Sequence, residues 1–173
     1  MTTQEQNTIR QRTCWPEEII RHIGSMAEAE IYMRTGLQAW KVGGRWALCR
    51  TDIDWSDYSI RRNTWLRDSP QQGLKKYEEW AQYNNVDLIG EGFPPRDQNG
   101  DPYELHNIGQ HQDSPLAELT WAEHKGDGNF SILHHFDDES EIDRQQFDAE
   151  KSQHWQARFK AFSEDEKHRI YNK

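Results

Sequence analysis

The sequence predicts an α+β fold, and three patterns in its 173 residues indicate it. Isoleucine and methionine recur at roughly helical spacing from Ile19 to Met33. Two glycines, Gly43-Gly44, separate two short apolar runs, which is typical of a β-hairpin. A long charged stretch that starts at Ser140 carries apolar residues along one side and predicts a C-terminal helix. Those apolar residues are Ile142, Phe147, Trp155, Phe159 and Phe162.

The N-terminal region is predicted to combine an unstructured start with a helix. Met1 to Arg12 carry almost no apolar side chains, so we expect residues 1–14 to be disordered or frayed. Pro16-Glu17-Glu18 indicates a helix start, because proline suits the first turn and acidic side chains favour the positive end of the helix dipole. This helix ends near Gly36, and the hairpin follows it.

The middle of the chain is predicted to contain an insertion after the hairpin. Residues 56–72 are polar and rich in turn-forming residues, so we interpret them as a loop. Apolar side chains on one face of Leu74 to Tyr83 predict a short helix. We therefore assign residues 15–96 to one N-terminal segment that holds the helix, the hairpin and the insertion.

The C-terminal segment, residues 97–173, is expected to begin with a turn and a strand. Asn99-Gly100 is a tight-turn signature that leads into a strand from Tyr103 to His106. Ser114-Pro115 is expected to start a short turn or helix. Thr120 is a suitable N-cap for a further short helix before the long final one.

Composition indicates a polar folded domain with a small core. The mean hydropathy is −1.14, but eight Trp, six Tyr and six Phe each remove a large apolar area from water when buried. The net charge is −9, which disfavours phosphate binding unless cations gather locally. Such a local basic face is available from several arginines. They are Arg45, Arg50, Arg61, Arg62 and Arg67.

Cysteine content and apolar runs exclude several classes of protein. Cys14 and Cys49 cannot build a disulfide framework or a cysteine-rich zinc site, and each is expected to be a small buried hydrophobe. No apolar run approaches the roughly 20 residues that span a membrane, and no signal peptide is visible. If the protein is exported, another machine or a larger parent protein must carry it.

One stretch of the C-terminal segment is more specific than any composition argument. It reads Tyr103-Glu104-Leu105-His106-Asn107-Ile108-Gly109-Gln110, and Asn129 and His134-His135 follow it. With Ser114-Pro115-Leu116-Ala117-Glu118-Leu119-Thr120 and Ser140-Glu141-Ile142-Asp143-Arg144, it resembles the LHH toxin nucleases of the HNH/endonuclease VII superfamily. The family text is Glu-Leu-His-His-Ile-Gly-Gln, so this chain carries Asn107 where the family has a second histidine.

The resemblance implies a fold and a biological role. The fold is a His-Me finger core (ββα-metal, treble-clef-like) with additional helices and a long C-terminal helix. The role is that of a toxic module from a bacterial polymorphic toxin system, carried by a larger toxin or a secretion apparatus into a competing cell. Such an effector cleaves DNA in the cytoplasm of the target cell, and a cognate immunity protein guards the producer.

The resemblance also assigns the metal ligands. It places His106 at a ligand position and His134 at the second one, with His124 as the alternative to His134. One divalent cation is implied, and Zn²⁺, Mn²⁺, Ni²⁺ and Mg²⁺ all stay open, although neutral nitrogen ligands suit the first three better.

Further residues are assigned to catalysis and to phosphate on the same basis. Asn107 occupies the general-base position, and Asn129 supports the base loop or binds metal. Glu104 belongs to the same catalytic text, and Arg50 and Arg144 are assigned to phosphate binding.

Asn107 has three readings. A carboxamide cannot accept a proton as imidazole does, so the chain is expected to have little or no activity. The asparagine is either an engineered inactivating change or a natural replacement in a degenerate nuclease. In the third reading a nearby histidine, His111 or His135, supplies the base.

Two rival functions and one rival site stay open. A pseudo-nuclease would keep the fold as a protein-binding module, and an RNase would use the same metal site on a different substrate. Asp52 and Asp54 lie two apart, so on a strand they would share a face and bind metal. Otherwise they are turn residues or salt-bridge partners of Arg50.

Overall fold

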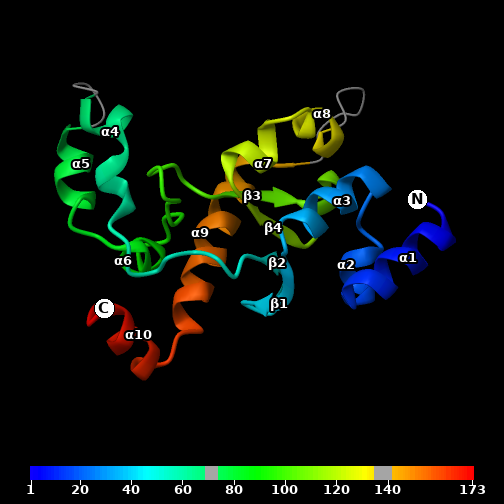
Figure 1. Ribbon diagram of the computed structural model, residues 1–173, viewed down its shortest axis with the longest axis horizontal. Helices are drawn as coiled ribbons and strands as arrows, with labels where there is room; N and C mark the ends of the chain where they lie inside the picture. The colour runs from blue at the N-terminus through cyan, green and yellow to red at the C-terminus, as the bar shows by residue number, and fades with distance from the viewer. Residues whose placement is uncertain (69–73, 135–141) are drawn as a thin grey trace. The chain divides into compact units, whose positions relative to one another are not determined.

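The computed structural model describes residues 1–68, 74–134 and 142–173. Contacts divide the chain into two compact units, and each unit combines two separate stretches. Unit 1 contains Met1–Thr51 and Glu104–Asp148, and unit 2 contains Asp52–Tyr103 and Ala149–Lys173. The sequence boundary expected between residues 96 and 97 therefore does not separate the two units. Helices and strands both occur, so the predicted α+β class is confirmed (Figure 1).

The N-terminus of unit 1 is helical, so the expectation of a frayed segment is wrong. Helix α1 (Thr3–Thr13) begins at a capping box in which the Thr2 hydroxyl accepts from the Glu5 amide and the Glu5 carboxylate accepts from the Thr2 amide. Ile9 is fully buried in the core of the unit. One well-placed apolar residue and a cap therefore order a segment that composition alone describes as unstructured.

The helical stripe predicted from Ile19 to Met33 is divided into two helices. Helix α2 (Glu17–Ile20) begins after Pro16, as expected, and helix α3 (Met26–Arg34) begins where the Ser25 hydroxyl accepts from the Glu28 amide. The apolar spacing continues across the break, because both helices turn their isoleucines into the same core.

Unit 1 holds a four-stranded sheet in the order β1-β2-β4-β3 (Figure 1). Strands β1 (Gln38–Val42) and β2 (Arg45–Cys49) form the predicted antiparallel hairpin, and Gly43 and Gly44 both have positive φ. Strand β3 (Glu104–Asn107) confirms the predicted strand and pairs antiparallel with β4 (Leu116–Leu119).

Strand β4 lies where a turn or short helix was expected after Ser114-Pro115, so that expectation is wrong. All four of its residues are buried, and β4 pairs with β2 on one side and with β3 on the other. A strand that is covered on both faces shows no alternation of polar and apolar residues, so its sequence carries no strand period.

In the core of unit 1, the sheet packs against helices that precede it and follow it in the sequence. The buried members of this core are Ile9, Trp15, Ile19, Ile20, Ile23, Ala29, Ile31, Tyr32, Leu37, Leu48, Ile108, Ala117, Leu119 and Leu133.

Two short helices follow the sheet in unit 1. Helix α7 (Trp121–Lys125) begins at the predicted Thr120 cap, which forms a complete capping box with Glu123. Helix α8 (Asn129–Leu133) begins after Gly128, whose φ of 76° places it in the left-handed region. Helix α8 was not predicted from the sequence.

Unit 2 contains ordered structure where a loop was predicted. The 3₁₀ helix η1 (Ser59–Arg62) and helix α4 (Thr64–Asp68) occupy the described part of residues 56–72, and residues 69–73 lie outside the described part. Ile60 and Leu66 are buried together with Leu88. The loop prediction is therefore wrong. Ile60 and Leu66 contribute to a core, but the polar residues around them in the sequence hide this pattern.

The remaining helices of the chain are α5 (Leu74–Trp80), α6 (Asn85–Gly90), α9 (Arg144–Lys160) and α10 (Glu164–Tyr171). Helix α5 agrees with the predicted short helix. Helix α9 confirms the long C-terminal helix, although Ser140 lies outside the described residues. Helix α10 follows a capping box at Ser163 and was not predicted.

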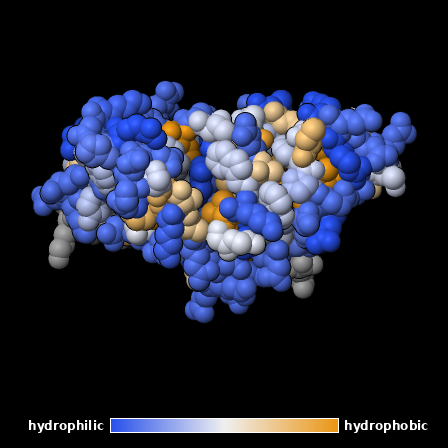
Figure 2. Space-filling view, turned by 90° about the horizontal axis from the view of Figure 1, so that it is seen from below, coloured by the Kyte–Doolittle hydropathy of each residue, from blue (hydrophilic) through white to orange (hydrophobic). Residues whose placement is uncertain are grey.

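The surface agrees with the polar composition. Figure 2 shows a face that is mainly hydrophilic, with apolar residues in small groups. Cys49 is buried, as expected, whereas Cys14 is exposed at the end of α1, so the expectation is wrong for Cys14. None of the helices in the described part of the chain combines the length and the apolar character that crossing a membrane requires.

Gly109 is the tightest glycine of unit 1, within the 3₁₀ helix η2 (Ile108–Gln110). Its φ is +71°, and a Cβ added there would lie 2.0 Å from the carbonyl oxygen of His22. We expect Gly109→Ala to destabilise the fold by more than the roughly 1–3 kcal/mol typical of one strained residue. Thermal unfolding measures this loss.

Gly44→Ala is the matched control for that measurement. Gly44 has a similar φ of +80°, but no atom lies within 4 Å of the added Cβ. Equal losses in the two variants would show that the close approach to His22 contributes nothing.

Candidate metal centre

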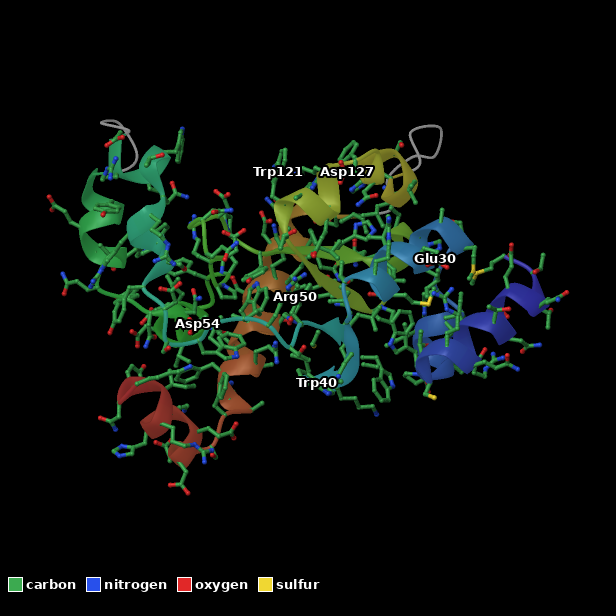
Figure 3. The ribbon with its side chains drawn as sticks, in the orientation of Figure 1. Glu30, Trp40, Arg50, Asp54, Trp121 and Asp127 are labelled. Carbon is green, nitrogen blue, oxygen red and sulfur yellow. The ribbon has the colours of Figure 1, made fainter. Side chains whose placement is uncertain are left out.

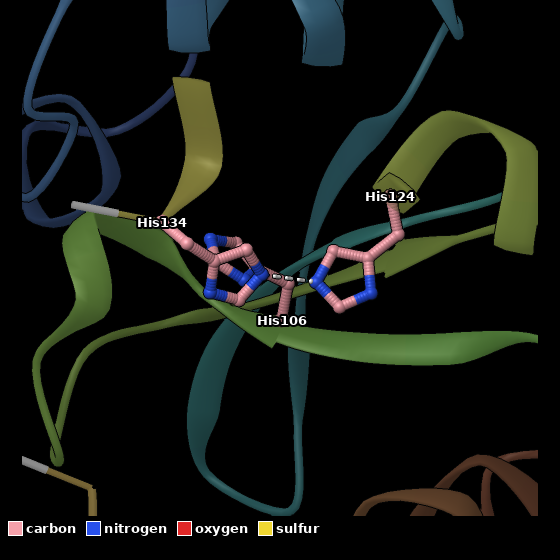
Figure 4. Close-up of side chains that lie close together, drawn as sticks. All are labelled: His106, His124 and His134. Atoms are coloured by element: carbon pink, nitrogen blue, oxygen red, sulfur yellow. Dashed lines mark hydrogen bonds between the residues drawn. The ribbon is translucent and has the colours of Figure 1, made fainter. Parts of the chain in front are cut away.

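Three histidines from three different elements of unit 1 meet at one point (Figure 4). His106 lies on β3, His124 on α7, and His134 directly after α8. The structure thus brings together both histidines that the sequence analysis places at ligand positions and also the alternative, His124.

The three imidazole rings form a nearly equilateral triangle. Ring centroids are 5.1 Å apart for His106 and His124, and 5.0 Å apart for each of the other two pairs. Ligand nitrogens of all three residues lie within 4.8 Å of one another. Nε2 of His124 and Nε2 of His134 are 2.9 Å apart (Figure 4).

Burial favours the neutral form of two of these rings, those of His106 and His134. Burial first, and then the nearby His124 and His134, holds the pKa of His106 well below its ordinary value. Burial also acts first on His134, where it and the charges of His124, Lys125 and Arg144 lower the pKa to about 4. A neutral imidazole offers the lone pair that a metal ion needs.

An unsatisfied nitrogen marks the centre of the triangle. Nε2 of His106 is buried and has no hydrogen-bond partner among the described residues. A buried polar atom of this kind normally has a hydrogen-bond partner. Nε2 of His106 has none in the described structure, although other imidazole nitrogens lie close to it, and a bound ligand would satisfy it. Three convergent imidazoles are a donor set that fits a divalent transition metal ion.

Glu104 fixes the orientation of His124. Oε1 of Glu104 lies 2.7 Å from Nδ1 of His124 and 3.4 Å from Nζ of Lys125. Burial raises the pKa of Glu104, but the hydrogen bond and charge of His124 and the charge of Lys125 outweigh it, so the net pKa is lowered. An ionised carboxylate only accepts, so Nδ1 of His124 donates to Glu104, and Nε2 is the ring atom of His124 that faces His134.

Gln110 occupies the corresponding place at His134. Its Nε2 lies 3.2 Å from Nδ1 of His134. A carboxamide donates through nitrogen and accepts through oxygen, and a flip exchanges the two, so Gln110 serves either tautomer of the ring. Gln110 has a φ of 60°, a conformation that non-glycine residues rarely adopt and that surrounding structure must hold.

Glu28 is part of what holds that conformation. Its carboxylate is almost fully buried and accepts from the Gly109 amide at 2.8 Å and from the Gly24 amide at 2.7 Å. The Tyr32 hydroxyl also donates to it. Helix α3 is thereby tied to the loop that carries Gln110, which in turn contacts His134.

Asn129 acts on the same site through the backbone. Its Nδ2 donates to the Glu123 carbonyl at 2.9 Å, and its amide donates to the Gly126 carbonyl at 2.8 Å. These bonds close the turn between α7 and α8. This turn separates His124 from His134, and it is a different segment from the base loop that the resemblance assigned to Asn129.

Asn107 is turned toward a loop. It is buried, and its Nδ2 donates to the carbonyls of His111 and Gln112 at 3.1 and 3.2 Å. Consecutive residues of a strand point to opposite faces, so its side chain leaves β3 on the other side from His106. His111 is exposed, and His135, the other alternative base, lies outside the described residues.

Comparison with known proteins gives one match. Residues 84–161 match a family model described as LHH, a nuclease of the HNH/ENDO VII superfamily with conserved LHH. The matched segment, a little under half of the chain, is similar to this nuclease family. No curated protein and no solved structure matched the chain.

The match covers the metal centre of the nuclease segment in full. The site residues that lie inside it are Glu104, His106, Asn107, His124, Asn129, His134 and Arg144. The family description names a conserved LHH; inside the matched segment the chain reads Leu105-His106-Asn107 at one place and Leu133-His134-His135 at another.

The two arginines assigned to phosphate differ in their surroundings. Arg144 is exposed at the start of α9, and its charge acts on His134. Arg50 is buried, and its guanidinium pairs with the Glu123 carboxylate while its amide donates to Glu118 at 2.9 Å. Figure 3 shows Arg50 in the segment that follows β2. The structure therefore places Arg50 in a buried ion pair and Arg144 at the surface.

Asp52 and Asp54 lie in unit 2, and neither belongs to a strand of the described structure. The Asp54 carboxylate accepts from the amide and hydroxyl of Ser56 at 3.2 and 2.9 Å, so Asp54 shapes a turn. Arg50 pairs with Glu123, which neither reading of the aspartates had included.

Sequence reasoning missed three contributors to the nuclease site. Glu28 and Lys125 were not considered, and Gln110 was noted only as a letter of the motif. Glu28 sits on the apolar stripe of α3, four residues before Tyr32, and a carboxylate on a buried face is a usable signal. The positive φ of Gln110 leaves no signal in sequence.

We expect His106→Ala to abolish high-affinity binding of Zn²⁺, because it removes one of three ligands. Glu104→Gln and Gln110→Ala are expected to weaken binding by about 10–100-fold, since each removes the partner that orients a ligand. Titration against a chromophoric chelator measures the affinities. His168→Ala, on the exposed helix α10, is the matched control and should bind like the parent protein.

Arg50→Met tests whether Arg50 is structural. Removing one partner of a buried pair leaves Glu123 uncompensated, and we expect a loss of roughly 3 kcal/mol in unfolding free energy. That is the low end for buried pairs, because Glu123 stays partly exposed. Urea unfolding measures it. A variant of unchanged stability that had lost only nucleic-acid affinity would instead show Arg50 to be a phosphate contact.

Proposed function

We propose that the protein is a metal-dependent endonuclease toxin domain that cleaves DNA, and that Asn107 leaves this form with little activity. The observation that carries the proposal is the convergence of His106, His124 and His134 inside a segment of the LHH nuclease family. Its outward role would be that of an effector, delivered into the cytoplasm of a target cell and neutralised by an immunity protein.

The ligand set favours certain ions. Three imidazole nitrogens suit Zn²⁺, Ni²⁺ or Mn²⁺ better than Mg²⁺, which prefers oxygen. A divalent ion held there would neutralise charge on the scissile phosphate and on the leaving oxygen. The side chains of His124 and His134 would be held for it by Glu104 and Gln110.

Two cations beside the cluster support a phosphodiester substrate. Lys125 lies 3.4 Å from Glu104, and both Lys125 and Arg144 act on His134 through their charge. Both side chains lie at the surface, so an approaching phosphate would meet them before it reached the imidazoles. They supply positive charge locally, in a chain whose net charge is −9.

Asn107 supports the proposed loss of activity. Its amide nitrogen is occupied by two backbone carbonyls, and a carboxamide has no basic nitrogen to take a proton from water. The same observation favours a second candidate, a pseudo-nuclease that keeps the fold as a protein-binding module. An RNase acting through the same three imidazoles is the other candidate.

The test compares the chain as written with Asn107→His in a plasmid-nicking assay, with Mn²⁺ or Zn²⁺ and with EDTA. We expect Asn107→His to cut about 10²–10⁴-fold faster, because an imidazole released from the His111 and Gln112 carbonyls and turned to the metal centre would supply a general base. EDTA and the double change Asn107→His/His106→Ala should each abolish cutting. Total RNA in a parallel reaction identifies an RNase.

Three results would contradict parts of this proposal. If both forms cut equally, Asn107 does not mark the base, and His111 becomes the next residue to replace. If neither form cuts DNA or RNA although both bind metal, the pseudo-nuclease is favoured. If RNA alone is cut, the choice of DNA is wrong.

A further inference from the structure

One exposed aromatic ring packs against an imidazole, and a second lies one helical turn from another. Phe130 on α8 is 37% exposed, and its ring centroid lies 4.3 Å from that of His134, with the planes tilted by 32°. Trp121 on α7 is 54% exposed. In a chain this polar, large aromatic rings left in water beside a proposed catalytic centre call for a ligand with a flat apolar face.

Helix α7 sets Trp121 beside the centre. Trp121, His124 and Lys125 occupy positions i, i+3 and i+4, which are neighbours on one helix surface. His124 turns inward to the metal centre, while Figure 3 shows Trp121 projecting outward from the helix. An aromatic ring and a cation therefore adjoin one ligand, and a second aromatic ring covers another.

The charges of this rim are those that a nucleic-acid strand requires. Lys125 lies beside Glu104, and Arg144 acts on His134, so two cations accompany the two aromatic rings. A phosphate backbone pairs with cations, and bases stack on aromatic rings. In a duplex the faces of the bases are covered by their neighbours, so only an unpaired strand presents them.

We propose that Trp121 and Phe130 form a stacking platform for bases next to the scissile phosphate, so the site takes unpaired stretches of nucleic acid. This inference rests on the proposed nuclease function and names its substrate class. Phe130 would hold the base nearest His134, and Trp121 a base farther along the strand. Lys125 and Arg144 would contact the phosphates between and beside them.

The binding test uses the protein as written, whose low expected activity spares the probe. Fluorescence anisotropy compares a labelled oligothymidylate with a labelled duplex of the same length, both with Mn²⁺. We expect tighter binding of the single strand. Trp121→Leu and Phe130→Leu should each weaken it by about tenfold, as expected for the loss of one stacked base, and leave duplex binding unchanged.

The leucine substitutions keep an apolar side chain in place and remove only the flat ring. In particular, Phe130→Leu still covers His134, and an unchanged Mn²⁺ affinity would show that the metal centre is intact. Trp65→Leu is the matched control, since Trp65 is 63% exposed on α4 in the other unit and should bind both probes like the parent protein. Lys125→Gln should lower the salt dependence of log Kd by about one.

Three results would overturn the inference, and the first two are distinguishable from the third. If Asn107→His cuts plasmid while Trp121→Leu and Phe130→Leu bind the single strand as the parent does, the platform is wrong and the nuclease stands. Equal affinity for single strand and duplex would count the same way. If neither probe binds and Asn107→His cuts nothing, both the platform and the nuclease function are wrong.

Discussion

Three imidazole nitrogens must be held together in a place that water hardly reaches, and this requirement organises unit 1. Nε2 of His106 is buried without a protein partner in the described structure, and Nε2 of His124 faces Nε2 of His134 at 2.9 Å. Leaving one such group unpaired costs about 1–3 kcal/mol. Burial lowers the pKa values of His106 and His134, so these two rings stay neutral. A bound cation would coordinate the nitrogens and offset that cost, so metal binding is expected to stabilise the fold.

The scaffold meets the requirement with hydrogen bonds that each fix one element. The pairing of β3 with β4 sets His106 opposite Ala117, and the Thr120 capping box fixes the start of α7, four residues before His124. Asn129 closes the turn to α8. Glu28 reaches from α3 to the Gly109 amide and so supports the loop of Gln110. These contacts join segments that lie far apart in sequence, which explains why the site depends on the whole unit and not on the motif alone.

Local signals were sufficient for the parts of the fold with a short-range cause. The hairpin follows from two glycines, α7 from its Thr120 cap, and β3 from the turn before it. The parts that failed have long-range causes. Strand β4 is paired on both sides and shows no period, α1 is ordered by a single buried Ile9, and the core around Ile60 and Leu66 is hidden in polar sequence. The site divides in the same way. The motif text singles out His106, His124 and His134, whereas Gln110 and Lys125 act through tertiary contacts that no spacing encodes, and Glu28 leaves only the signal of a carboxylate on an apolar stripe.

X-ray absorption at the metal edge of the Zn²⁺-loaded protein tests the central claim most directly. The account predicts a first shell that contains three imidazole nitrogens at about 2.0–2.1 Å, with the multiple scattering that histidine rings produce. Loss of one ring from that shell in His106→Ala, His124→Ala or His134→Ala would assign each ligand. A shell of oxygen atoms alone, or one unchanged by those substitutions, would contradict the account, because the three imidazoles would then be a buried cluster with no metal to hold.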